Sequence, residues 1–356
     1  MGQCCPPSGG RLDLWRHLRK HGAVLRQLRS RATLNPILRS HAADRDPETS
    51  AACDYAMTTS TLRNKLAAHS FVLTAEITPP LSTNPQDLIE KVAPLRGLAD
   101  AVNVTDGASA RAHMEAIAAA SLMLENEIEP VMQVTCRDRN RIALQSLLVG
   151  AGALGIPNLM FLTGDDPKMG DQPDAKPVFD IDSTALTATA ASIRDAHQLL
   201  HGRAVGGHAD YFIGIGDMPQ DPKDGWTPKS LLKKIEAGAQ FAQTQFCMDT
   251  GVLKRYLARC HECGVAKDFP FIVGVAPLAS AKSARWIKEH LFGSIVPDSI
   301  VERMDKAEDQ KAEGRAICVE LIRELSEIPG VAGAHVMAPL NESSLPLVLE
   351  AVRKGK

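Results

Sequence analysis

The stretch "VLTAEITPP", residues 72–80, has the sequence of a buried β-strand that ends at two prolines. A single ionisable residue, Glu76, interrupts the apolar run. Burying a carboxylate without a partner is costly, so a glutamate in such a strand is either paired or used in chemistry. An open, doubly wound sheet would normally carry a glycine-rich phosphate-binding turn after its first strand, and two prolines are the opposite of such a turn.

Seven further strand-like runs follow this one, and helical patterns such as 140–155 and 231–240 separate them. Thr227 and Pro228 are expected to begin the second of these helices, as its N-cap and its first residue. Eight strands that alternate with helices predict an α/β fold, a (β/α)8 or TIM barrel. The predicted strands are 71–77, 101–105, 130–135, 158–164, 211–216, 241–246, 271–276 and 333–338.

Composition excludes several classes of protein. The chain has 356 residues, of which 44% are hydrophobic, and a net charge of −2. That balance provides no basic field for nucleic acid or an anionic membrane, and no apolar run has the length of a membrane-spanning helix. Eight cysteines in a chain of this length indicate a reducing compartment rather than a disulfide scaffold. We therefore expect a cytoplasmic enzyme.

Residues 1–56 differ from the rest because they are rich in arginine and lack the strand–helix alternation. We expect a basic, disordered extension, or an upstream start with Met57 as the natural first residue. A targeting peptide or a basic interaction arm is the alternative. Residues 57–356 would then form a single barrel domain.

Function in such a barrel belongs at the carboxyl-terminal ends of the strands. The polar residues at the predicted ends are Glu76, Thr105, Asp106, Gln133, Thr135, Thr163, Gly164, Asp165, Asp217, Gln245 and His335. Any one of them alone is explained as a turn or cap residue, but together they predict a polar pocket with acids and amides. The long connection 164–181 is predicted to be a lid or ligand clamp, since structureless loops of this length are uncommon in compact domains.

The pair Cys260 and Cys263 frames a C-x-x-C motif. With no second such pair and no paired histidines near it in sequence, we expect ordinary thiols on an outer helix and no metal site.

Four motifs in order along the chain resemble the methylenetetrahydrofolate reductase family of flavin-dependent (β/α)8 barrels. The resemblance covers roughly residues 70–352 and looks closest to the short reductases of the acetogen type. The motifs are "AEITPP" (75–80), "FLTGDDPKMGDQPDAKPVFDIDS" (161–183), "KKIEAGAQFAQTQF" (233–246) and "GVAGAHVMA" (330–338).

The resemblance implies reduction of 5,10-methylenetetrahydrofolate to 5-methyltetrahydrofolate by NAD(P)H, or the reverse reaction. Glu76 matches the family's general acid, which protonates N10 so that the methylene bridge opens. Asp165 matches a second catalytic residue, beside flavin and folate. Gln245 matches the substrate-binding amide that contacts the ring stacked on the flavin.

The implied cofactor is FAD, with FMN or a loosely held flavin as alternatives. The residues matched to flavin binding are Thr105, Asp106, Gln133, Thr163, Gly164, Asp165, Asp180, Met218, Lys233 and Lys234.

Several positions depart from the family pattern. Gln133, Thr163 and Met218 stand where a histidine, an arginine and a tyrosine are expected, and Glu342 replaces an arginine near the last strand. This branch therefore holds its flavin differently, holds it loosely, or has dispensed with it. A pterin-binding methyltransferase barrel and a non-catalytic folate-holding subunit are the alternative functions. A homo-oligomer is expected from the resemblance alone.

Overall fold

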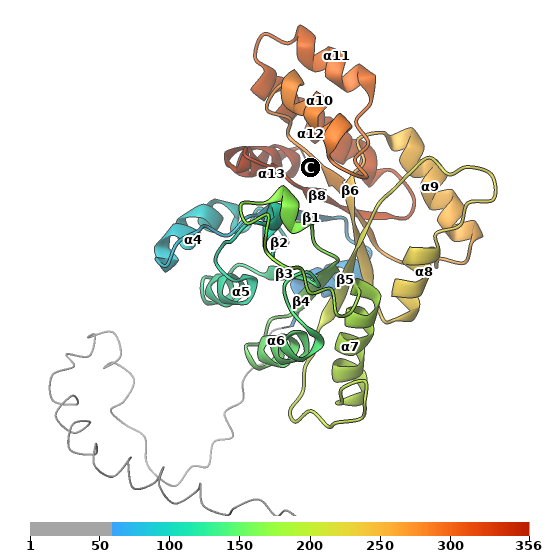
Figure 1. The fold of residues 1–356 in the computed structure, drawn as a ribbon. Helices are drawn as coiled ribbons and strands as arrows, with labels where there is room; N and C mark the ends of the chain where they lie inside the picture. The colour runs from blue at the N-terminus through green and yellow to red at the C-terminus, as the bar shows by residue number, and fades with distance from the viewer. Residues whose placement is uncertain (1–58, 356) are drawn as a thin grey trace, which may run out of the picture. The chain divides into compact units, whose positions relative to one another are not determined.

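The computed structural model describes residues 59–355, so the predicted extension 1–56 lies outside the described part of the chain. Eight parallel strands pair in sequence order and β8 pairs with β1, which closes the barrel and confirms the predicted fold (Figure 1). The strands are β1 (Val72–Ile77), β2 (Ala101–Val104), β3 (Pro130–Thr135), β4 (Asn158–Leu162), β5 (Phe212–Asp217), β6 (Phe241–Phe246), β7 (Phe271–Val275) and β8 (Val331–Val336).

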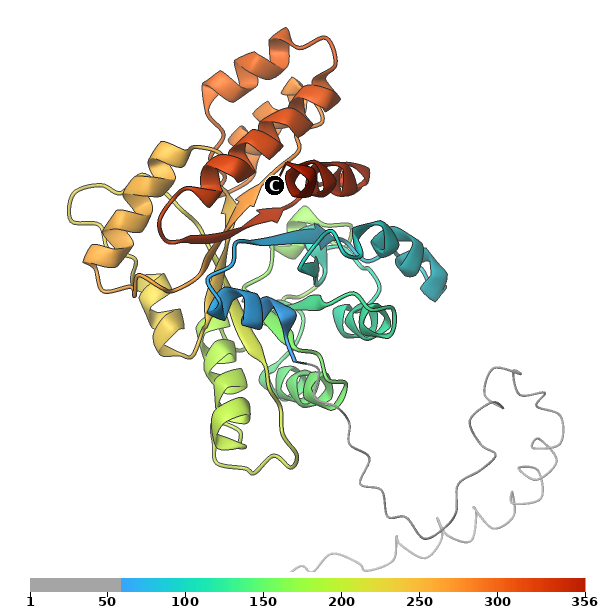
Figure 2. The same ribbon diagram turned by 180° about the vertical axis from the view of Figure 1, so that it is seen from behind.

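Helices surround the strands, and two views from opposite sides show them on the outside of the barrel (Figures 1 and 2). The α-helices are α3 (Thr61–Ala67), α4 (Pro85–Val92), α5 (Ala116–Glu125), α6 (Arg141–Ala153), α7 (Ser183–Ala196), α8 (Lys229–Glu236), α9 (Thr250–Glu262), α10 (Ala281–His290), α11 (Asp298–Lys306), α12 (Gln310–Ser326) and α13 (Leu345–Lys354). Single 3-10 turns are η2 (Ala93–Leu95), η3 (Ala108–Ala110), η4 (Pro167–Met169) and η5 (Glu342–Ser344).

The observed strands begin and end within two residues of the predicted ones. The predicted start of α8 is wrong, because Pro228 has a ψ of 57°, outside the helical range, and serves as the N-cap without a side-chain bond. The connection 164–181 is not wholly structureless, since η4 lies within it.

Helix α3 closes the amino-terminal end of the barrel. Its Leu62 and Leu66 are buried against Val72, Phe212 and Phe241, which come from the first residues of three strands. The burial of these five apolar side chains blocks this end of the barrel. A ligand can therefore reach the barrel interior only from the carboxyl-terminal end, as the fold class requires.

An insertion between β7 and β8 forms a smaller apolar core, in which Met248, Leu278 and Met304 are buried among α10, α11 and α12. The chain between α10 and α11 returns to the barrel, where Ile295 exchanges backbone hydrogen bonds with Phe246 and Met248 at the end of β6. No helix within residues 59–355 is long and apolar enough to cross a membrane.

Candidate active site

Glu76 lies at the carboxyl-terminal end of β1, with its side chain 23% exposed. The Gln133 amide of β3 donates a 2.6 Å hydrogen bond from Nε2 to Glu76 Oε2. His335 Nε2 of β8 lies 3.5 Å from the same oxygen. Both contacts use Oε2, so the protein orients the carboxyl group through one oxygen, and no residue within 59–355 donates a hydrogen bond to Oε1.

A buried chain of polar side chains lies directly beneath Glu76, and we call it the interior network. Asn103 and Gln243 exchange two amide hydrogen bonds of 2.6 and 3.1 Å. Gln243 Nε2 also donates to Thr74 Oγ1 at 3.2 Å, and Thr74 Oγ1 lies 2.9 Å from His335 Nδ1. Because all four residues are fully buried, the network costs little only while every member stays paired.

His335 was expected at the rim, and that expectation is wrong. In the register of β1 and β8, His335 pairs with Thr74, which is two residues before Glu76. The imidazole side chain is 2% exposed, beneath the rim. Its contact with Glu76 nevertheless connects it to the candidate site.

Sequence reasoning missed three members of the interior network, Thr74, Asn103 and Gln243. A usable signal was present: each stands two residues before a polar residue predicted at a strand end, and alternate residues of a strand face the same side.

Thr105 and Asp106, predicted to bind flavin, have different surroundings. Thr105 is buried, and its hydroxyl has no hydrogen-bond partner among the described residues. Asp106 is fully engaged by the protein, with Oδ2 accepting from the Thr135 amide at 2.8 Å and from Arg139 Nη1 at 2.8 Å. A buried unpaired hydroxyl at the mouth of a barrel is a group that a ligand or water satisfies, so Thr105 fits a cofactor site better than Asp106 does.

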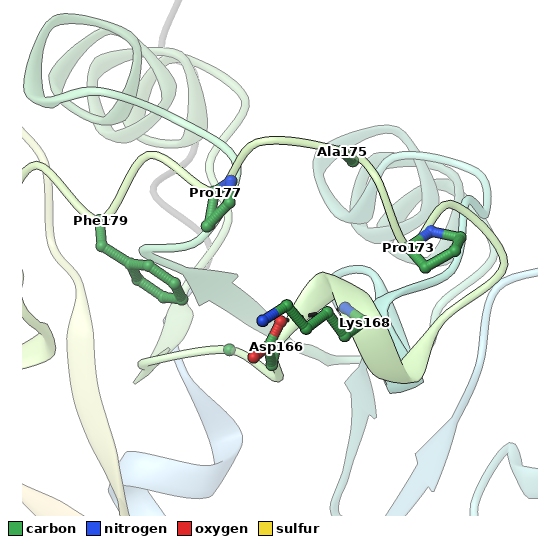
Figure 3. A pocket seen from close by; sticks show the side chains of 7 residues that line it. Asp166, Lys168, Pro173, Ala175, Pro177 and Phe179 are labelled. Atoms are coloured by element: carbon green, nitrogen blue, oxygen red, sulfur yellow. Dashed lines mark hydrogen bonds between the residues drawn. The ribbon is translucent and has the colours of Figure 1, made fainter.

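Thr163, Gly164 and Asp165 follow β4 directly, and Asp165 is exposed. Beside them the loop encloses a cavity of about 480 Å³. Asp166 and Lys168 lie side by side in this cavity, which the ring of Phe179 borders (Figure 3). The lining residues are Gly164, Asp166, Lys168, Pro173, Ala175, Pro177 and Phe179.

Three other residues that were predicted to bind flavin do not line this cavity. Asp180 pairs with Arg141, whose hydrogen bond holds the pKa of Asp180 well below its usual range. Met218 packs on the chain after α10, where a Cβ added at Gly293 would lie 2.8 Å from its sulfur. Lys233 is exposed on α8.

Lys234 is more deeply placed than Lys233. Its Nζ donates a 2.9 Å hydrogen bond to the carbonyl of Gly216 near the end of β5. Burial lowers the pKa of Lys234, while the carboxylates of Asp217 and Asp182 act in the opposite direction.

Asp217 was expected on the polar rim, but its carboxylate turns to the helical layer and accepts a 2.7 Å hydrogen bond from Tyr256 of α9. Burial raises the pKa of Asp217. A Cβ added at the preceding residue, Gly216, would contact Leu162 and Met160 inside the barrel, so Gly216 faces inward. Because successive residues of a strand face opposite sides, Asp217 faces outward.

Gln245 is the residue before the last in β6 and is half buried, and its Oε1 accepts a 3.0 Å hydrogen bond from the amide of Phe246. Glu342, which replaces an expected arginine, accepts from the amide of Thr78 at 2.9 Å and pairs with Lys91 at 2.6 Å. Glu342 thus secures the segment that follows Glu76.

Cys260 lies on the outer helix α9, as predicted, and Cys263 caps its end. Burial raises the pKa of the Cys260 thiol to about 12. Within residues 59–355 no group of three or more His, Cys, Asp or Glu side chains is arranged to hold a metal ion.

A closed (β/α)8 barrel with a carboxyl group at its open end, contacted by an amide and by a buried imidazole, defines the class of protein: a TIM barrel with a polar site at the carboxyl-terminal ends of its strands. A family model described as methylenetetrahydrofolate reductase matches residues 61–353. The chain belongs to this family.

Individual relatives are distant in sequence. Methylenetetrahydrofolate reductase 2 of Schizosaccharomyces pombe is 25% identical over 249 residues, which are 64% of this chain and 36% of that protein. A probable methylenetetrahydrofolate reductase (NADPH) of Caenorhabditis elegans is 24% identical, with 66% and 34% covered. The 5,10-methylenetetrahydrofolate reductase of Pectobacterium carotovorum is 25% identical, with 61% and 67% covered. The chain thus spans about a third of the length of the two eukaryotic relatives.

Proposed function

We propose that the chain catalyses reduction of 5,10-methylenetetrahydrofolate to 5-methyltetrahydrofolate with NAD(P)H. Membership of the family supports the reaction class. The observation that carries the proposal is the placement of Glu76 at the open end of the barrel, held through Oε2 by Gln133 and His335.

The chemistry requires one proton and one hydride. As the bond between N10 and the methylene carbon breaks, N10 takes a proton, and the methylene carbon takes the hydride to become the methyl group. Glu76 supplies the proton from Oε1, since Oε2 already accepts the amide hydrogen of Gln133. A positioned acid of this kind contributes roughly 10²–10⁴-fold to a rate.

A flavin bound at this site would supply a hydride carrier between the nicotinamide and the folate. The residues fit such a group: Thr105 offers an unpaired hydroxyl, the cavity beside Gly164 offers space, and Lys234 and Lys168 offer positive charge. FAD is proposed, with FMN as the smaller alternative.

Asp165 and Gln245 complete the proposed substrate site. The exposed carboxylate of Asp165 would stabilise positive charge on the opened folate. The Gln245 amide, whose Oε1 is already bonded to Phe246, would offer Nε2 to the ring edge. Assembly into a homo-oligomer and a cytoplasmic location stay predictions, as do the absence of nucleic-acid and membrane partners.

The visible spectrum of the purified protein under anaerobic conditions tests the proposal. We expect a flavin band that bleaches when 5-methyltetrahydrofolate is added and also when NADH or NADPH is added. A flavin band that the nicotinamide bleaches but the folate leaves unchanged would refute the folate assignment. In a colourless protein, direct transfer between nicotinamide and folate would be measured in place of bleaching.

A further inference from the structure

Arg137 lies two residues beyond β3, in the loop that follows it, and its side chain is only 4% exposed. Neither the predicted site nor the proposed mechanism uses this residue. A buried guanidinium requires partners for its donors, so its contacts identify what it is for.

The contacts of Arg137 reach three different rim loops. Nη2 donates to the carbonyl of Gly107 after β2 at 3.2 Å, and Nη1 donates to the carbonyl of Asp165 after β4 at 3.4 Å. Nε and Nη2 donate to the carboxylate of Asp138, in its own loop, at 2.8 and 2.7 Å. The Arg137 carbonyl accepts from the amide of Val178 at 2.7 Å, at the far end of the loop after β4.

The neighbouring backbone is shaped around this side chain. A Cβ added at Gly107 would lie 2.3 Å from Arg137 Nη2, and one added at Gly164 would lie 2.9 Å from Arg137 Cβ. Both glycines also have positive φ, of 62° and 95°. Any other residue at either position would meet both a steric and a conformational obstacle.

The same loops also contact each other directly, because a Cβ at Gly170 would lie 1.9 Å from the carbonyl oxygen of Ala110. The loops after β2, β3 and β4 therefore form one packed unit, and Arg137 lies between them. We call this unit, consisting of Arg137, Asp138 and the carbonyls of Gly107 and Asp165, the arginine junction.

We propose that Arg137 is a positioning residue, whose guanidinium fixes the backbone of Asp165 and with it the start of the loop 164–181, while its main-chain carbonyl holds the far end of the loop at Val178. The role in catalysis rests on the proposed function, while the role in holding the loop does not. The planar fork of arginine suits this task, because it reaches three acceptors at once in fixed directions.

Substitution of Arg137 separates these two roles. We expect Arg137→Met to lower the rate of hydride transfer to or from the folate by about 10²-fold, since misplacing a catalytic group by about 1 Å costs that much. The rate at which NAD(P)H reduces the proposed flavin should fall by less than threefold. Arg137→Lys should lose nearly as much as Arg137→Met, because an ammonium keeps the charge but lacks the fork.

Limited digestion with trypsin supplies a measurement that does not depend on activity. Lys168 is an exposed residue of the loop, and the bond between Lys168 and Met169 is open to trypsin, whereas Lys176 is followed by a proline. We expect both Arg137 variants to be cut after Lys168 about tenfold faster than the unsubstituted protein. Arg255→Met is the matched control, since Arg255 pairs with Asp221 of another rim loop at an exposed site.

Faster cutting in both Arg137 variants with no change in Arg255→Met would support the positioning role. It would do so even if the protein failed to react with folate, which would refute only the proposed function. An unchanged cutting rate and unchanged folate rate in Arg137→Lys would overturn the inference, as would cutting that rises equally in Arg255→Met.

Discussion

The interior network and the arginine junction both place a carboxylate at the open end of the barrel, but they are built on different parts of the fold. The interior network lies on regular strands and joins side chain to side chain beneath Glu76. The arginine junction lies on loops and joins one side chain to backbone carbonyls around Asp165. Strands fix Glu76 through register, whereas the side chain that contacts Asp165 is a guanidinium bonded to its main-chain carbonyl.

The largest expected effect is that of a substitution at Glu76, the carboxylate that the strands position. Glu76→Gln keeps the shape of the side chain but removes the proton that N10 needs. We expect the folate half-reaction to slow by about 10²–10⁴-fold, while reduction by NAD(P)H remains within about threefold of normal. Single-turnover absorbance measures both. Equal loss in both half-reactions would show a role in binding or folding instead of proton transfer.

Gln243→Leu tests whether the interior network contributes to the stability of the fold. The substitution leaves the buried amide of Asn103 without the partner of both its hydrogen bonds to Gln243, while Thr74 loses one donor and keeps His335. We expect the free energy of unfolding in urea to fall by about 1–3 kcal/mol. Gln172→Leu, at an exposed site in the loop, is the control and should change it by less than about 0.5 kcal/mol. Equal values for the two variants would mean that the network is not needed for stability.

The effect of Asp217→Asn on the free energy of unfolding is expected to depend on pH. Because burial raises the pKa of Asp217 in the folded state, the folded protein binds more protons than the unfolded chain above the ordinary carboxyl range. Asp217 therefore lowers stability as pH rises through its folded pKa. We expect the stability of the variant, measured by urea unfolding at each pH, to rise relative to that of the unsubstituted protein as pH increases above the ordinary carboxyl range. A constant difference would contradict the assignment.

Lys91→Met is expected to have the smallest effect. The pair of Lys91 and Glu342 is partly exposed, with 28% and 25% of the side chains accessible. Exposed pairs contribute about 0–1 kcal/mol. We therefore expect a loss of stability no larger than about 1 kcal/mol, measured as a shift of the urea midpoint. A larger loss would show that the segment after Glu76 depends on this pair as strongly as the interior network depends on Gln243.

The strands were predictable because period-two patterns and buried apolar runs determine them locally. Glu76 was recognisable as the one charge in such a run. Gln133 was predicted to contact flavin, but its amide lies on Glu76, a pairing between strands that depends on the closed barrel. The side of the sheet that Asp217 faces could be predicted only by knowing the exact residue at which β5 ends. Arg137 left no usable pattern, because loops bring its acceptors together from sequence-distant residues.

The formation of product tests the central claim most directly. The protein would be incubated without oxygen with 5,10-methylenetetrahydrofolate and NADH or NADPH, and 5-methyltetrahydrofolate would be quantified by mass spectrometry. We predict one methyl product for each nucleotide oxidised, and at least about 10²-fold less from Glu76→Gln. Absence of the methyl product from the unsubstituted protein, or equal yield from the variant, would contradict the account.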